Sequence, residues 1–327
     1  MTFDRPDNPF YFDLPLRHAW SAPVLGVPVR LRSNAESVIA AAEASFGAWH
    51  ALKARPDLVE ARSADVRLVV HDGYAGPAGV EYRRPDPRTV VLLGAGGGGY
   101  ADASTGTALA YVSPAAVAEV EQFRYLVLEA LVLFLLTGRD RHPVHASAAV
   151  RDGVAVLFAG AGGLGKSTLA YAASRAGWTV LSDDVVYVQS APVWRIWGGP
   201  GARSYVPPDA ARFFPELRAL TPELRANGRE RLAVTRASVA PPVCERAVLC
   251  LLERGRGGGS SPRLEPIAAD AAMAVLAHAP ESGFDVFAEQ ARERLTPLAA
   301  RAWRLCLGDD PRDVVPLLER AVQGAGG

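Results

Sequence analysis

The 327-residue sequence predicts an α/β protein with two lobes. Short apolar segments with strand-like spacing alternate with amphipathic helical segments along the chain. A long apolar segment at 113–138 separates a strand-rich region from one in which a glycine loop, 160–165, joins a strand directly to a helix. We therefore expect a smaller N-terminal mixed α/β domain over 1–112, a connecting helix over 113–138 and a C-terminal domain over 139–327.

The N-terminal elements follow from residue alternation and helical spacing. Segments 27–33 and 66–72 alternate as strands do, and 35–52 between them has the spacing of an amphipathic helix. Segments 79–94 and 106–113 add at least two more strands, separated by a run of glycines. This pattern predicts a mixed α/β region.

The segment 113–138 has the end signals of one helix. Ser113 is a suitable N-cap, Pro114 occupies the first helical position and Gly138 closes the end. Its length and apolar C-terminal half predict a buried helix that joins the two lobes.

The C-terminal domain is predicted to open with a hairpin and a strand–loop–helix unit. Segments 145–150 and 154–160 flank an Asp-Gly pair, which favours a tight turn. A helix is expected over 166–177, followed by one strand over 178–189 that contains two aspartates. Further along we expect a turn-rich stretch at 192–208, short helical pieces at 209–220, a hairpin of 246–255 with 262–268 around a flexible loop at 254–261, and helices at 269–279, 291–307 and 311–323.

Composition excludes several classes of protein. The formal net charge is zero, so no basic field favours nucleic acid or an anionic membrane as a partner. The three cysteines lack zinc-ligand spacing, which also makes a disulfide framework unexpected. The N-terminus is acidic and proline-rich rather than signal-like, and the most apolar run, 125–136, is too short to span a bilayer. We expect a cytoplasmic protein.

Two glycine-rich loops could bind a nucleotide, and the first is a poor candidate. Residues 94–99 satisfy the pattern GxGxxG after a strand. A dinucleotide site needs a helix directly behind that loop, because the helix N-terminus holds the pyrophosphate. Here turn and strand residues follow, so we interpret the run as a mobile hairpin loop.

The second loop is a complete GxxxxGK[ST] motif between an apolar strand and a helix. Its backbone N–H groups and the helix N-terminus can bind phosphate, Lys166 can reach the β- and γ-phosphates, and the Ser167 hydroxyl can ligate Mg²⁺. Lysine is otherwise found only at Lys53, so a chance match is improbable. The predicted phosphate-binding residues are Gly160, Ala161, Gly162, Gly163, Leu164, Gly165, Lys166, Ser167 and Thr168.

A pair of aspartates reduces the number of reactions that the glycine loop could serve. Asp183 lies 17 residues after Lys166, which is enough for one helix and the next strand. Adjacent strand residues point to opposite faces, so Asp183 and Asp184 should have separate roles. One can hold Mg²⁺ while the other accepts a proton from an attacking hydroxyl, although Asp-Asp pairs are also common in turns and caps.

Over residues 144–188 these features together resemble the catalytic domain of the HPr kinase/phosphorylase family, a P-loop fold related to phosphoenolpyruvate carboxykinase. The histidine-led hairpin "HASAAVRDGVAVLFAG", the loop "GAGGLGKS" and the segment "RAGWTVLSDDVV" carry the resemblance. It implies a P-loop kinase core of that type beside the N-terminal α/β domain.

The resemblance implies roles for individual residues. His145 would lie near the reacting phosphate, although a lone histidine at the start of a strand is often structural. Asp183 would take the proton from a serine hydroxyl, and Asp184 with Ser167 would ligate Mg²⁺.

The sequence also departs from the family pattern. Its later acidic and Ile-Arg-Gly signature has no clear counterpart, and Thr168 stands where the HPr enzymes usually carry glutamate. Arg203, Arg229 and Arg231 are candidates to face substrate or phosphate, although an arginine at such a position is more often a solvated surface residue. The chain therefore resembles the broader group of HPr kinase-like proteins, some of which resemble kinases that phosphorylate a serine of a ribosomal peptide.

We therefore expect an ATP- and Mg²⁺-dependent kinase that transfers the γ-phosphoryl group to a hydroxyl, with a serine of a peptide or protein as the favoured acceptor. Asp183, His145 and Lys166 are the predicted catalytic residues. A nucleotide-binding regulatory or scaffold module without transfer, and a small-molecule kinase, remain alternatives. No nucleic acid or membrane partner is expected, and a homo-oligomer is left open.

Overall fold

The computed structural model describes residues 14–72, 79–199, 203–225, 228–236, 243–254, 261–277 and 288–324. It is a mixed α/β protein with several sheets, and it divides into two compact units, Met1–Arg139 and Asp140–Gly327. The acidic N-terminus up to residue 13 and most of the expected loop at 254–261 lie outside the described residues.

The first unit is built on a seven-stranded sheet with the order β1-β2-β3-β7-β6-β5-β4. The β2–β3 and β3–β7 pairs are parallel and the others antiparallel. β2, β4, β5 and β7 fall within predicted segments, β3 begins two residues before its predicted segment, and β1 and β6 were not predicted. The strands are β1 (His18–Val24), β2 (Val27–Ser33), β3 (Ala64–Val70), β4 (Val80–Asp86), β5 (Thr89–Gly94), β6 (Gly97–Asp102) and β7 (Thr107–Val112).

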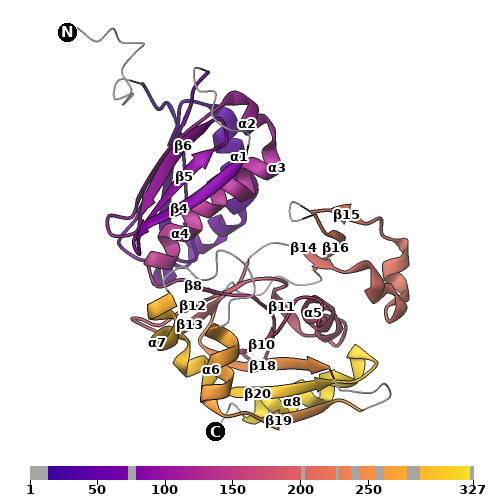
Figure 1. Ribbon diagram of the computed structural model, residues 1–327. Helices are drawn as coiled ribbons and strands as arrows, with labels where there is room; N and C mark the ends of the chain where they lie inside the picture. The colour runs from indigo at the N-terminus through magenta and orange to yellow at the C-terminus, as the bar shows by residue number, and fades with distance from the viewer. Residues whose placement is uncertain are drawn as a thin grey trace, which may run out of the picture. The chain divides into compact units, whose positions relative to one another are not determined.

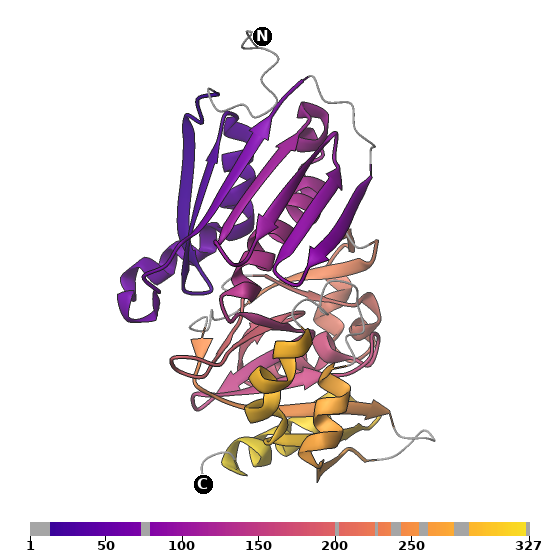
Figure 2. The same cartoon turned by 60° about the vertical axis from the view of Figure 1, so that its left-hand side comes forward.

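Helices cover one face of this sheet (Figures 1 and 2). Along β2, Val27, Val29 and Leu31 are buried while Arg30 and Arg32 are exposed, as expected for a strand with one covered face. The helical segments are α1 (Glu36–Phe46), the 3₁₀ segments η2 (Gly47–Ala54) and η3 (Pro56–Leu58), α2 (Pro114–Ala118), α3 (Val120–Phe123), the π-helical η4 (Arg124–Glu129) and α4 (Ala130–Gly138).

The expected single helix over 113–138 is interrupted. Its N-terminus is as predicted, because the Ser113 side chain accepts a hydrogen bond from the Ala116 N–H and Pro114 follows. The helix then breaks at Glu119, whose ψ of 65° leaves the helical region, and it continues through a π-helical turn. The segment packs on β3, β6 and β7 of the first unit.

The glycine run at 94–99 forms a hairpin, which confirms the hairpin prediction. Ala95 and Gly96 make the turn with positive φ, while Gly97–Gly99 belong to β6 itself and not to a loop. A Cβ at Gly97 would lie 1.7 Å from the Tyr111 carbonyl oxygen, so these glycines permit close approach of β7.

The second unit is centred on a six-stranded sheet with the order β11-β9-β10-β18-β20-β19. The predicted hairpin is confirmed: β9 and β10 pair antiparallel around Asp152 and Gly153, both with positive φ. β18 and β20 run parallel to β10. The strands of this sheet are β9 (Ala146–Arg151), β10 (Val154–Ala159), β11 (Thr179–Ser182), β18 (Arg246–Arg254), β19 (Arg263–Pro266) and β20 (Ala302–Leu307).

Two smaller sheets and several helices complete the second unit (Figure 1). The sheets are ordered β17-β13-β12-β8 and β14-β16-β15. The strands are β8 (His142–Val144), β12 (Val186–Gln189), β13 (Arg195–Trp197), β14 (Arg203–Val206), β15 (Glu223–Leu224), β16 (Glu230–Thr235) and β17 (Val243–Cys244). The helices are α5 (Lys166–Arg175), η5 (Pro208–Arg212), η6 (Pro215–Ala219), α6 (Ala269–Ala277), α7 (Ala288–Ala299), η7 (Pro311–Val314) and α8 (Val315–Gly324).

Three predictions in this unit were wrong. The 246–255 and 262–268 segments do not pair, because β20 lies between β18 and β19. The C-terminal part of the expected helix at 291–307 is β20, since α7 ends at Ala299 and the chain then enters the sheet. The expected single strand at 178–189 is two strands, β11 and β12, in different sheets, with the aspartates in the bend between them.

The strand before the glycine loop is buried on both faces. Ala155 and Leu157 of β10 pack in the cluster that includes residues of α6 and α7. Val156 and Phe158 pack in the opposite cluster with α5 and α8. Burial of both faces explains why the sequence of β10 is continuously apolar and does not alternate between apolar and polar residues. The central sheet thus gives a rigid support to the glycine loop that follows β10.

Burial of His142 in β8 predicts acid sensitivity of the fold. Burial and the nearby Arg294 lower the pKa of His142 from 6.5 to about 4, although Asp140 opposes this. Because the unfolded chain binds the proton more tightly, the stabilisation is complete above pH 6.5 and is lost as pH falls toward 4. We expect the free energy of unfolding to fall by about 3 kcal/mol over this range.

Urea unfolding of the wild type and His142→Leu between pH 4 and 7 tests this expectation. The variant should lose most of the slope over that range, whatever its absolute stability. Parallel curves for the two proteins would assign the acid sensitivity to other groups.

No helix among the described residues is long and apolar enough to cross a lipid bilayer.

Candidate functional site

The glycine loop leaves the C-terminal end of β10 and enters α5 directly. Gly163 and Gly165 have φ of 82° and 102°, a left-handed backbone that L side chains rarely adopt. A Cβ built at Gly162, Gly163 or Gly165 would meet no atom within 4 Å. The space beside these three glycines is therefore open. It lies next to the N-terminus of α5, where the helix dipole favours an anion.

Lys166 bends back over this loop. Its Nζ donates to the carbonyl oxygens of Gly160 at 2.9 Å and Ala161 at 3.3 Å. The side chain is largely buried, and these two bonds hold its ammonium at the loop.

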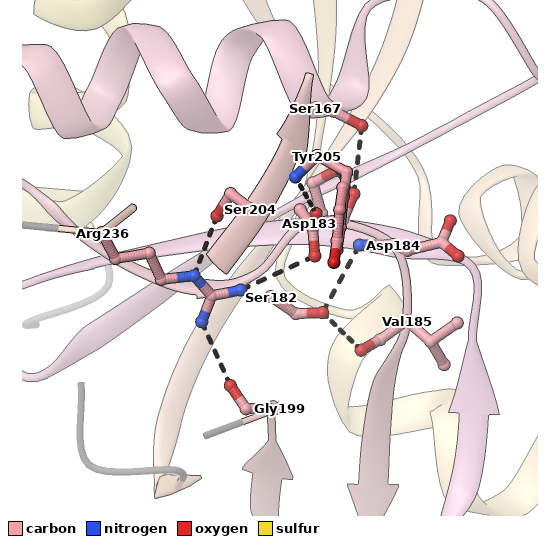
Figure 3. A network of polar contacts seen from close by, with 10 residues as sticks. Ser167, Ser182, Asp183, Asp184, Val185, Gly199, Ser204, Tyr205 and Arg236 are labelled. Carbon is pink, nitrogen blue, oxygen red and sulfur yellow. Dashed lines mark hydrogen bonds and ion pairs between the residues drawn. The ribbon is translucent and has the colours of Figure 1, made fainter. Parts of the chain in front are cut away.

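The next residue, Ser167, joins the loop to the aspartate pair. Its Oγ donates to the backbone carbonyl oxygen of Asp183 at 3.1 Å, and Ser147 Oγ of β9 donates to the same oxygen at 2.6 Å. The first turn of α5 and the bend after β11 are thereby tied together, which brings Ser167 beside both aspartates (Figure 3).

Asp183 is held in a buried polar network (Figure 3). Its carboxylate accepts a hydrogen bond from the Tyr205 N–H of β14 and lies 3.6 Å from Arg236 Nη2. Arg236 also donates to Ser204 Oγ at 2.8 Å and to the Gly199 carbonyl oxygen at 3.1 Å. The Asp183 side chain is only 17% exposed and that of Arg236 5%.

Burial dominates the electrostatics of this pair. It raises the pKa of Asp183 above its ordinary 3.8, while Arg236 and the Tyr205 N–H act in the opposite direction. Burial likewise lowers the pKa of Arg236, and Asp183 opposes that change. A carboxylate with a raised pKa is a better proton acceptor than one on the surface.

Asp184 points to the other side of the chain (Figure 3). Its side chain is 70% exposed, and its Oδ1 lies 3.5 Å from Nδ1 of His145, whose side chain is only 9% exposed. The Asp184 N–H donates to Ser182 Oγ at 3.4 Å. The two aspartates thus occupy different environments, as the sequence predicts.

His145, the glycine loop from Gly162 onward, Ser167, Thr168 and Asp184 all line one cavity of about 1020 Å³. Asp183 is not among its lining residues. Within the described part of the chain no cluster of three metal-binding side chains occurs. Ser167 and Asp184, a hydroxyl and a carboxylate that line this cavity together with Asp209 and Asp309, fit Mg²⁺, which takes few protein ligands and completes its shell with phosphate oxygens and water.

Of the three candidate arginines, the structure places Arg229 and Arg231 on the cavity and Arg203 outside it. Nη1 of Arg203 lies 3.9 Å from Oε1 of Glu223. Two further arginines, Arg212 of η5 and Arg254 at the end of β18, also line the cavity.

Sequence reasoning missed Arg236, Arg212 and Arg254. Arg236 lies 53 residues after Asp183 in the sequence and carries no motif. Arginine makes up about 10% of the chain, so residue type alone could not distinguish these three positions from the other arginines.

A second cavity of about 550 Å³ lies in the first unit, beside β1, β2 and η2. It contains none of the predicted site residues and no carboxylate.

Comparisons with known proteins find similarity only to solved structures, and not to a family model or a curated protein. Among solved structures, the chain is similar to the Hpr(Ser) kinase/phosphatase from Coxiella burnetii, with 15% sequence identity and a TM-score of 0.30. The match covers 56% of this chain and 94% of that chain.

Proposed function

We propose that the protein is an ATP- and Mg²⁺-dependent kinase that transfers the γ-phosphoryl group to a hydroxyl, with serine of a peptide or protein as the acceptor. In this proposal the second unit is a P-loop core of the HPr kinase type. The observation that carries it is the aspartate pair, because Ser167 of the glycine loop is bonded to the backbone that holds one buried and one exposed carboxylate.

The loop and Lys166 would bind the phosphates. Successive N–H groups at the start of α5 and the ammonium, now 2.9 Å from the Gly160 carbonyl oxygen, offer donors to the β- and γ-phosphate oxygens. Ser167 and Asp184 would hold Mg²⁺, which when bound neutralises charge on those oxygens.

Asp183 would act on the proton of the acceptor hydroxyl, and His145 would orient the metal ligand Asp184. Asp183, with its raised pKa, would accept the proton of the attacking hydroxyl at a carboxylate oxygen. His145 would hold Asp184 through the 3.5 Å contact between its Nδ1 and Oδ1.

Removal of the lysine ammonium tests the phosphate site. We expect Lys166→Ala to weaken MgATP binding by about tenfold to a hundredfold, since one charge-assisted contact to phosphate is lost. Calorimetric titration of ATP, with and without Mg²⁺, measures this.

Lys53→Ala is the matched control, because Lys53 is the only other lysine and lies exposed in η2 of the first unit. It should bind ATP as the wild type does. Equal affinity of Lys166→Ala and the wild type would contradict phosphate binding by this loop.

One observation favours the alternative of a nucleotide-binding module without transfer. The Asp183 carboxylate is already engaged by Arg236 and the Tyr205 N–H and does not line the cavity. ATP binding by the wild type without phosphate transfer to any serine or small-molecule hydroxyl, and without ATP hydrolysis, would support this second function.

A further inference from the structure

Besides the glycine loop and the first turn of α5, three groups of residues line the cavity of about 1020 Å³. The first group is His145 and Asp184, which precede β9 and follow β11. The second group follows the ends of β18 and β20, and we call it the β20 side: Arg254, 307–309, Pro311 and Val314. The third group lies on η5 and next to β16. A ligand that fills the cavity would therefore contact three different parts of the second unit.

The strand order places the first group and the β20 side on opposite sides of the glycine loop. The loop leaves β10 in a sheet ordered β11-β9-β10-β18-β20-β19 (Figure 1). β18 and β20 run parallel to β10, so their C-terminal ends lie at the same edge of the sheet as the loop. Asp184 lies beyond β9, whereas Asp309 follows β20, two strand spacings or roughly 10 Å on the other side of β10.

The third group lies next to the proposed base. The Asp183 carboxylate accepts a hydrogen bond from the Tyr205 N–H of β14, and the chain continues from β14 through Pro207 into η5. An acceptor hydroxyl that reaches Asp183 would therefore approach from the side of β14 and η5. Asp209 of η5 also lines the cavity on that side.

The direction of the nucleotide follows from these positions. In the proposed function, Ser167 and Asp184 hold the metal at the γ-phosphate, and the acceptor occupies the side of β14 and η5. The phosphate chain would then run over the glycine loop away from Asp184. The β20 side of the cavity is where it would lead, because β18 and β20 follow β10 in the sheet.

The lining of the β20 side suits an uncharged group that offers hydrogen-bond donors. Its apolar surface comes from Leu307, Pro311 and Val314, and Leu164 of the glycine loop packs against the same apolar cluster as Leu307. Asp309 adds a carboxylate to this lining. A carboxylate repels phosphate, but it accepts hydrogen bonds from hydroxyl and amino groups.

The two adjacent aspartates after β20 have different surroundings. The Asp310 carboxylate accepts a hydrogen bond from the Arg312 N–H at 2.9 Å and forms an ion pair with the Arg312 guanidinium. Asp310 is not among the described residues that line the cavity. Asp309 is exposed and lines it, so Asp309 is the carboxylate that a ligand on the β20 side would meet.

We propose that the β20 side is the nucleoside subsite, in which the Asp309 carboxylate accepts hydrogen bonds from the 2′- and 3′-hydroxyls of a ribose and the apolar side chains beside it contact the base. The inference rests on the proposed function for the direction of the phosphate chain. Asp309 then selects ribonucleotides, since a sugar without these hydroxyls offers its carboxylate no donor.

The test compares three ligands, each with Mg²⁺: ATP, 2′,3′-dideoxy-ATP and tripolyphosphate. They are titrated calorimetrically into the full-length protein, and tripolyphosphate reports on the phosphate site alone. We expect the wild type to bind ATP at least about tenfold more tightly than the dideoxy nucleotide, because hydrogen bonds to a charged acceptor are lost.

Two variants locate the ribose. Asp309→Ala should lose the preference for ATP over the dideoxy nucleotide. It should bind tripolyphosphate at least as tightly as the wild type, because removal of a carboxylate weakens the repulsion of phosphate. Asp209→Ala, which removes an exposed aspartate from the η5 side of the same cavity, should keep the preference. Circular dichroism checks that both variants are folded.

Several outcomes would overturn the proposal. Equal affinity of the wild type for ATP and the dideoxy nucleotide, or a preference that survives in Asp309→Ala, would remove the ribose contact. Loss of the preference in Asp209→Ala alone would place the ribose on the η5 side. Weaker tripolyphosphate binding by Asp309→Ala would assign Asp309 to the metal or the phosphates.

Failure of the proposed function gives a different result. A wild type that binds none of the three ligands lacks the phosphate site on which both proposals rest. Absence of phosphoryl transfer, with the ribose preference present and dependent on Asp309, would contradict the kinase and leave the nucleoside subsite in place.

Discussion

Asp183→Asn is expected to bind MgATP within about threefold of the wild type and to lose about 10²- to 10⁴-fold in phosphoryl transfer, the usual contribution of a general base. The amide keeps an oxygen that can accept the Tyr205 N–H hydrogen bond, but it cannot take a proton from the acceptor hydroxyl. The binding and the chemical step should therefore separate in this variant.

The measurement is calorimetry for MgATP, followed by transfer of labelled phosphate to a serine peptide. Asp270→Asn, an exposed aspartate at the start of α6, serves as control for loss of one carboxylate. Transfer retained at more than about a tenth of the wild-type rate would remove Asp183 as the base.

The pH dependence of transfer adds a second readout on the same residue. Because burial raises the pKa of Asp183, the rate should rise with pH through a value above the ordinary 3.8 of an aspartate. Arg236 lowers the pKa of Asp183, so this acidic limb should move to still higher pH when Arg236 is replaced by glutamine.

Arg236→Ala is expected to reduce the free energy of unfolding at pH 7 by about 3 to 5 kcal/mol, because it leaves the buried Asp183 carboxylate without its cationic partner. The guanidinium also donates to Ser204 and to the Gly199 carbonyl oxygen, and both bonds are lost with it. Urea unfolding monitored by fluorescence measures the loss.

The sign of the pH effect follows from the raised pKa of Asp183. Without Arg236 that pKa rises further, so the folded state binds the proton more tightly than the unfolded chain. The deficit of the variant should therefore shrink as pH falls toward the ordinary pKa of aspartate and grow as pH rises through the folded pKa.

A double-mutant cycle separates this pair from simple loss of packing. Asp183→Asn/Arg236→Ala should be more stable than the sum of the two single losses predicts, since it removes the unpaired charge. Strictly additive losses would show that Asp183 and Arg236 do not stabilise one another.

Local signals were sufficient for the hairpin before the glycine loop, for the loop itself and for the helix after it. Asp152-Gly153 supplies the positive φ angles of a tight turn, and Gly163 and Gly165 supply those of the loop. These conformations depend on residues adjacent in the chain, so a single sequence is enough to predict them. The distance from Lys166 to Asp183 was enough to predict one helix and one strand between them, but the bend at the two aspartates was not predicted.

Pairings between distant segments were not predictable in the same way. β18 and β19 are close in sequence and both strand-like, yet β20 enters between them from about 40 residues further along. The alternation of residues in these strands is compatible both with direct pairing of β18 and β19 and with β20 between them. The choice is made by the apolar faces of the central sheet, which must be covered by α6 and α7 on one side and α8 on the other.

The same distinction between local signals and distant contacts applies to the candidate site. The sequence by itself was enough to predict the glycine loop, Lys166, Ser167 and the two carboxylates as candidate site residues, because such a prediction depends on residue type and short spacing. Only the tertiary structure decided which carboxylate is buried and that Arg236 is its partner. Burial and charge pairing depend on what packs against a residue, and that is set by segments more than 50 residues away.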